Sequence, residues 1–208
     1  MSNQPLELSI YDSRTSLRSV RARRVAVEVG DDGACWFCGC SITHYAGLRE
    51  KTARFAAPIC CLCHLCQHLE RPEIEREAVV IWLPEFTQGA LNALVRKIHL
   101  TLAAHDKPLG PDRRALHGRQ PLLAAASAYA ALDERSAAAK ERIGTASPRE
   151  LAEALSLLSA GSYARRTKLL GGARLLPLGR FFVDGRDVYP QMLKSVEATT
   201  KFVSPMEV

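Results

Sequence analysis

The order of apolar and polar residues predicts strands in the first part of the chain. A continuous apolar run that contains β-branched residues extends from Ala78 to Leu83, which is typical of a strand buried on both faces. Pro84 follows directly and predicts the end of this strand. The segment Leu6–Ile10 alternates apolar and polar residues, so it also has the period of a strand.

After Thr87 the apolar period becomes that of a helix. Apolar residues fall at i, i+3, i+4, i+7 and i+11, which makes one stripe along about four helical turns. The members of this stripe are Leu91, Leu94, Val95, Ile98 and Leu102. Thr87 has the side chain of an N-cap residue. The segment 105–114 contains two prolines and a glycine, and it predicts the end of the helix.

Two further helices are indicated by composition and end signals. An alanine-rich segment predicts one long helix from about Pro121 to Ile143, and Gly144 is expected to end it. The last helix is expected from Asp187 to Ala198, with Pro190 in the first turn, where proline is tolerated.

Between these two, Ser147 predicts the start of another helix. Pro148 would occupy the first helical position, and Glu150 lies three residues after the cap, as in a capping box. Gly161 is expected to close this helix. Its apolar stripe consists of Leu151, Leu155 and Leu158.

Composition and charge narrow the class of protein. The chain has 208 residues, close to the ~100–200 of one domain, and its charged fraction is average for a globular protein. The net charge of +6 permits an anionic partner without requiring one. The start of the chain has no apolar core of a signal peptide, and no apolar run is long enough to cross a bilayer. We therefore expect a cytoplasmic protein.

The seven cysteines are confined to one short segment, between Cys35 and Cys66. Disulfide scaffolds usually distribute their cysteines along the chain, so this clustering favours metal binding in a reducing compartment. Cys35 and Cys38 form a C-x-x-C-G knuckle, in which two thiolates can face one cation. Four thiolates around one ion describe a structural zinc site, and an iron–sulfur cluster or free buried thiols are the alternatives.

Two cysteine pairs in the sequence could supply the other two ligands of the metal site. Residues 60–66 contain two overlapping C-x-x-C pairs, Cys60 with Cys63 and Cys63 with Cys66. Only one pair can complete a tetrahedral site. The segment from Pro58 to His64 resembles the P-x-C-x-x-C-[HN] end of the HNH treble-clef knuckle. That resemblance favours Cys60 and Cys63, with Cys66 as the alternative to Cys60.

The HNH resemblance also bears on the fold class. The resemblance implies a small treble-clef-like, HNH-related zinc lobe, and the residue pattern predicts a mainly helical half after it, so the expected fold class is α+β. We expect the zinc-knuckle α/β lobe in residues 1–83 and the helical lobe in residues 84–208, together forming one compact domain.

An HNH nuclease needs a histidine general base, further metal ligands and an orienting asparagine between its two knuckles. Between Cys40 and Cys60 the chain offers only His44 and Glu50, and it has no asparagine there. We therefore expect a protein that is not an enzyme.

Four motifs together resemble the IcmJ/DotN family of type IVB secretion systems. They are the knuckle at 35–39, the cysteine cluster at 60–66, the W-L-P-E-F-T-Q segment at 82–88 with L-N-A-L at 91–94, and R-L-L-P at 174–177. The resemblance implies a non-catalytic, zinc-containing adaptor of the coupling complex. Such an adaptor would dock on the cytoplasmic tail of a DotL-like coupling ATPase beside a DotM-like subunit and help recruit protein substrates. It would be peripheral to the inner membrane through that complex.

Nucleic-acid binding related to that of HNH nucleases is the alternative function. Two arginine-rich stretches, Arg14–Arg24 and Arg165–Arg180, could contact phosphates. For the adaptor, large aromatic residues are the candidate partner-binding anchors, because such residues dominate interface hot spots, although each could equally be core. These candidates are Trp82, Phe86, Phe181 and Phe182.

Overall fold

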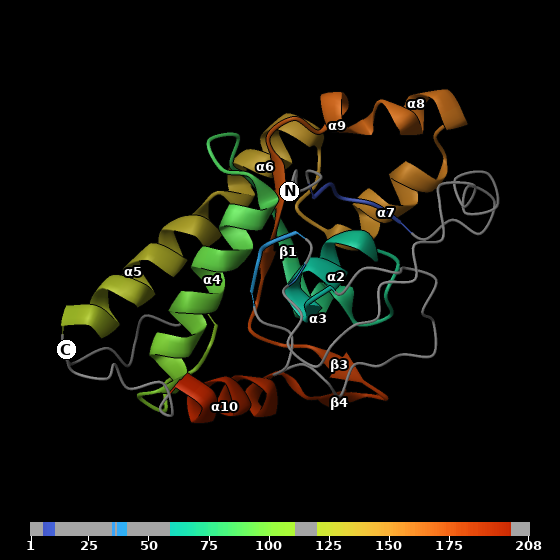
Figure 1. Ribbon diagram of the computed structural model, residues 1–208. Coiled ribbons are helices and arrows are strands. Elements are labelled where there is room, and N and C mark those ends of the chain that lie inside the picture. Colours follow the sequence, from blue (N-terminus) through green and yellow to red (C-terminus); the bar gives the residue numbers. More distant parts are fainter. Residues whose placement is uncertain (1–5, 11–34, 36, 41–58, 111–119, 201–208) are drawn as a thin grey trace.

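The computed structural model describes residues 6–10, 35, 37–40, 59–110 and 120–200 (Figure 1). The fold is mixed α+β, mostly helical with small sheets, which agrees with the expected fold class at this coarse level. A cysteine cluster lies near the N-terminal part of the fold. The expected division at residue 83 stays a prediction.

The elements follow one another in a simple order. The helices are α2 (Cys61–Gln67), α3 (Ile74–Glu77), α4 (Gln88–Ala103), α5 (Gln120–Glu134), α6 (Ser136–Ile143), α7 (Pro148–Ser156), α8 (Ala160–Ala164), α9 (Arg166–Leu169) and α10 (Tyr189–Thr200). The strands are β1 (Ala78–Trp82), β2 (Ala173–Pro177), β3 (Phe182–Val183) and β4 (Arg186–Asp187). β1 pairs antiparallel with β2, and β3 with β4.

The β1–β2 pair separates two apolar clusters. Val80 lies opposite Leu175, and both pack with the cysteines and α2. Val79 lies opposite Leu176 and faces the other way, toward α4 and α5. This division follows from the alternation of side chains along a strand. Figure 1 shows β1 at the centre of the molecule, between α4 on one side and α2 with α3 on the other.

The predicted strand at 78–83 is confirmed, but the long alanine-rich helix is interrupted. The structure ends α5 at Glu134 and starts α6 at Ser136, with Arg135 between them. The carbonyl of Arg135 accepts a hydrogen bond from the backbone N–H of Trp82, 3.2 Å away, and so satisfies a backbone donor of β1. The same carbonyl also accepts from the N–H of Ala139 in α6, so the break between the two helices coincides with a contact to a distant strand.

Two predicted helix starts are confirmed by their caps. The Thr87 hydroxyl accepts from the N–H of Ala90 at 3.2 Å, and the Ser147 hydroxyl accepts from the N–H of Glu150 at 3.0 Å. The capping box is incomplete, because the Glu150 carboxylate bonds to the hydroxyl of Thr145. The Ser147 N–H instead donates to that same Thr145 hydroxyl.

Three local expectations differ from the structure. Leu6–Ile10 is not a strand, although Ser9 exchanges backbone hydrogen bonds with Cys66 and Leu69. Gly161 does not end a helix, because α7 stops at Ser156 and Gly161 lies inside α8. Strand β2 was not expected, since a five-residue run rich in leucine has no strand signal until its partner β1 is known.

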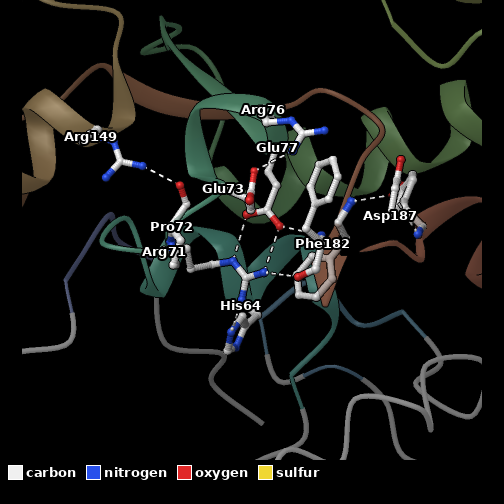
Figure 2. Close-up of polar contacts among 11 residues, drawn as sticks. His64, Arg71, Pro72, Glu73, Arg76, Glu77, Arg149, Phe182 and Asp187 are labelled. Atoms are coloured by element: carbon white, nitrogen blue, oxygen red, sulfur yellow. Dashed lines mark hydrogen bonds and ion pairs between the residues drawn. The ribbon is translucent and has the colours of Figure 1, made fainter. Parts of the chain in front are cut away.

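A buried ion pair fixes the turn between α2 and α3. The Arg71 guanidinium donates to both carboxylate oxygens of Glu77, at 2.9 and 2.8 Å, and to the carbonyl of Phe182. Glu77 is fully buried and also accepts from the backbone N–H of Phe182. Figure 2 shows both side chains facing the backbone of Phe182, so this pair ties residues 71–77 to β3.

None of the helices in the described part of the chain combines the length and the apolar character that crossing a membrane requires.

Candidate metal centre

The first cysteine pair lies in a tight backbone turn. The N–H of Gly39 donates to the carbonyl of Cys35 at 2.9 Å, and the N–H of Cys35 donates to the carbonyl of Cys40 at 2.7 Å. Gly39 has a φ of +69°, which a residue with a Cβ adopts only at a cost. The glycine therefore permits the turn that brings Cys35 and Cys38 to the same side.

The second pair lies at the start of α2. Cys60 is the N-cap residue, and Cys63 is in the first turn of the helix. The backbone N–H of Cys60 donates to the sulfur of Cys35 at 3.4 Å, which links the two pairs directly. The helix start thus presents two thiols toward the knuckle, as the HNH resemblance implied for Cys60 and Cys63.

The four sulfur atoms of Cys35, Cys38, Cys60 and Cys63 form one compact group. They all lie within 4.8 Å of one another, and the sulfurs of Cys38 and Cys60 are 3.6 Å apart. Three of the four residues are buried, and Cys38 is partly exposed. Sulfurs bound to one tetrahedral zinc lie about 3.8 Å apart, given Zn–S bonds of about 2.3 Å. The donor set and its spacing therefore fit a single metal ion of the zinc type.

Each sulfur of the group accepts a hydrogen bond from an N–H donor. Besides the contact to Cys35, the Arg96 guanidinium donates to Cys60 at 3.0 Å and to Cys38 at 3.6 and 3.7 Å. The Asn92 amide donates to Cys63 at 3.3 Å. Hydrogen bonding within the group, first of all with the Cys35 thiol, lowers the pKa of Cys38. The same hydrogen bonds within the group raise the pKa of Cys60 and Cys63, with Cys35 as the first partner in both cases. The N–H donors from Arg96 and Asn92 favour the thiolate, which is the form that binds a metal.

The remaining three cysteines have other surroundings. The Cys66 thiol donates to the carbonyl of Leu62 at 3.4 Å and accepts a longer contact of 3.8 Å from the Asn92 amide, and burial raises its pKa. Burial likewise raises the pKa of Cys61. Cys40 is partly exposed and is not one of the four grouped sulfurs. The geometry thus places Cys60, and not its alternative Cys66, beside the knuckle.

The two histidines on either side of Cys66 do not join the sulfurs. His64 and His68 stack on one another with ring centroids 4.2 Å apart. The Nδ1 atom of His68 lies 2.9 Å from a carboxylate oxygen of Glu70, and Nε2 of His64 lies 3.5 Å from Arg71.

The four aromatic candidates for partner binding differ in exposure. Phe181 and Phe182 are 1% and 7% exposed, so both are core residues, which was the alternative interpretation of these aromatic residues. Trp82 is partly buried, with the Arg142 guanidinium 5.3 Å from its ring centroid. Phe86 is 39% exposed and remains the candidate with an accessible ring.

The hydrogen-bond donors Asn92 and Arg96 were missed in the sequence. The periodicity placed apolar residues on one stripe of α4, and the polar residues between them could as well have faced solvent. The available signal was the spacing of four residues from Gln88 to Asn92 and from Asn92 to Arg96, which puts all three on one face of the helix. Their burial was not evident because the packing partner α2 lies at a distance in the sequence.

Comparisons with known proteins leave the family open. No protein-family model matches the chain, and none of the curated proteins is significantly similar to it. The segment that contains His44 and Glu50 and the basic stretch Arg14–Arg24 lie outside the described residues.

Proposed function

We propose that the chain is a zinc-stabilised, non-catalytic adaptor of a type IV secretion coupling complex. The observation that carries the non-catalytic part is the closed group of four thiols. Four sulfurs complete a tetrahedral zinc shell and leave no position for a water molecule, so the ion would hold the fold without activating a nucleophile. The knuckle and the helix that Cys60 caps also agree with a treble-clef-like arrangement.

The placement of three of the four family-like motifs supports the adaptor part of the proposal. The Cys63 sulfur accepts from Asn92, and Asn92 accepts from Gln88 at 2.9 Å. Gln88 in turn bonds to the backbone of Leu175 in both directions, at 2.8 Å. The Arg174 guanidinium donates to the carbonyl of Phe86 at 2.6 Å. Residues from the motifs at 60–66, 82–94 and 174–177 thus form one connected network, which supports their use as a joint signature.

The partner in this proposal is the cytoplasmic tail of a DotL-like coupling ATPase, with a DotM-like subunit beside it. Docking there would place the protein in the cytoplasm at the inner membrane and let it help recruit protein substrates. Phe86 is the proposed anchor, because its ring is accessible next to the start of α4. A large aromatic side chain at the centre of an interface contributes strongly to binding.

The test is a pull-down: the C-terminal tail of the DotL-like coupling ATPase from the same organism should capture the purified, zinc-loaded full chain. Phe86→Ser should weaken the complex about tenfold or more. Leu123→Ser is the matched control, because Leu123 has the same 39% exposure on α5 and should leave binding unchanged. A folded, zinc-loaded protein that forms no complex would overturn the adaptor. Salt-dependent DNA binding by that protein would favour the alternative function instead.

A further inference from the structure

Helix α4 carries a second, polar stripe beside its apolar one. Gln88, Asn92 and Arg96 follow one another at intervals of four residues, so they share one face of the helix. They are 3%, 0% and 8% exposed. Burying an amide or a guanidinium is costly unless it finds a partner, and two of these three side chains contact the cysteine sulfurs.

The charge of the proposed metal centre explains why an arginine lies there. A divalent ion held by four thiolates has a net double negative charge, and burying such a charge without compensation is unfavourable. Among the described residues, Arg96 is the cation whose guanidinium contacts the sulfurs. Its contact of 3.0 Å to Cys60, with two longer contacts to Cys38, places one positive charge against both halves of the site.

The orientation of Asn92 is determined by its neighbours. Gln88 donates to the Oδ1 atom of Asn92, which directs the Nδ2 amide toward the sulfur of Cys63 at 3.3 Å. Gln88 has no freedom to rotate its own amide, because it donates to the carbonyl of Leu175 and accepts from the N–H of the same residue. Strand β2 therefore fixes the direction of the hydrogen bond that reaches Cys63.

We propose that Arg96 is the positioning residue of the metal centre, a built-in counter-ion that neutralises part of the thiolate charge and holds Cys38 and Cys60 in ligating positions. Asn92 holds Cys63 in its ligating position by a hydrogen bond and adds no charge. This inference rests on the zinc centre of the proposed function and assigns a role to side chains outside the ligand set. Outer contacts of this kind typically change metal affinity by about 10- to 100-fold.

The role requires an arginine in particular. A planar guanidinium has several N–H groups in a fixed fork and can reach two sulfurs at once, as the contacts to Cys60 and Cys38 show. A lysine would keep the charge but offer one ammonium group on a flexible stem. Arg96→Lys should therefore retain part of the effect, and Arg96→Gln should lose it.

The test compares Arg96→Gln, Arg96→Lys and the control Lys97→Gln, the last at an exposed position on the same helix. Zinc affinity is measured by competition with a chromophoric chelator. Arg96→Gln should bind zinc about 10- to 100-fold more weakly, Arg96→Lys should be intermediate, and Lys97→Gln should match the original protein. Because metal binding and folding are coupled, a variant that is unfolded without zinc is measured by the zinc concentration that folds it.

Cobalt substitution gives a readout that a merely structural role would not move. N–H···S contacts stabilise the sulfur lone pairs, so removing the Arg96 contacts should shift the sulfur-to-cobalt charge-transfer band to lower energy in Arg96→Gln. An affinity and a spectrum equal to those of the original protein would overturn the role of Arg96 while leaving the metal centre intact. An original protein that takes up neither zinc nor cobalt would overturn the proposed centre itself.

Discussion

At the scale of single residues, the protein uses several cations inside the fold. Arg71 neutralises the fully buried carboxylate of Glu77, and Arg96 lies against the cysteine sulfurs. Arg166 pairs with Glu7 at 3.0 Å and also donates to the carbonyl of Leu8. The net charge of +6 permitted an anionic partner without requiring one, and these three side chains contribute their charge to contacts within the protein. The contacts of Arg96 and Arg166 could not be predicted, because Cys60 and Glu7 lie far from them in the chain. Glu77 is only six residues from Arg71, but its burial depends on the distant residue Phe182.

Removing Arg71 should destabilise the protein strongly. Arg71→Met leaves the buried Glu77 carboxylate without its cation, which costs about 3–5 kcal/mol of unfolding free energy. Arg76→Met is the control, because the Arg76–Glu73 pair is about half exposed and contributes at most about 1 kcal/mol, and the contact of Arg76 with the Phe182 ring adds about 0.5–1 kcal/mol. Urea denaturation of both variants measures the difference. Equal losses would contradict the buried-pair assignment.

His99 should make stability depend on pH. It is fully buried against the Tyr129 ring and the Tyr189 hydroxyl, and its Nε2 atom has no hydrogen-bond partner among the described residues. Burial, and then the charge of Arg96, lower the pKa of His99 from 6.5 to about 3. Below pH 6.5 the unfolded chain therefore binds a proton that the folded protein does not, so acid favours unfolding.

The difference is measured against His99→Asn, which keeps a polar atom near Tyr189 and does not titrate. Between about pH 7 and pH 5 the original protein should lose about 2 kcal/mol more stability than this variant. Groups other than His99 titrate in both proteins and cancel in the comparison. Parallel stability curves for the two proteins would show that His99 is not held neutral.

At the scale of elements, local signals predicted helix starts better than helix ends. The caps at Thr87 and Ser147 are local hydrogen bonds within four residues, so the sequence contains them. The interruption at Arg135 coincides with a contact to Trp82, and strand β2 pairs with β1. Both are contacts between distant segments, and no periodicity within the segment itself reports them.

Two glycines were expected to end helices, and substitutions at them should have opposite effects, because Gly144 does end a helix and Gly161 does not. Gly144 has a φ of +83° after α6, so Gly144→Ala should cost about 1–2 kcal/mol. Gly161 lies inside α8, and within the described part of the chain no atom would lie within 4 Å of an added Cβ. Gly161→Ala should therefore stabilise the protein by about 0.4–1 kcal/mol. Thermal melting of the two variants should shift in opposite directions, and equal shifts would refute this assignment.

At the scale of the whole molecule, the metal centre joins segments that are separate in the chain. The knuckle, the start of α2 and the polar face of α4 meet beside the β1–β2 pair. The spacing of the cysteines was enough to expect a four-thiol site and to narrow its second half to two pairs. Which residues surround that site follows only from the packing of α4 against α2. Hydrogen bonds between Gln88 of α4 and the backbone of Leu175 in β2 accompany this packing.

The most direct test of the account is the zinc content of the purified chain and of two single variants, Cys60→Ser and Cys66→Ser. Elemental analysis should give about one zinc per chain for the original protein and for Cys66→Ser, because the Cys66 thiol faces the carbonyl of Leu62. Cys60→Ser should lose most of the zinc, since Cys60 is one of the four grouped sulfurs. Full zinc in Cys60→Ser with loss in Cys66→Ser would contradict the site described.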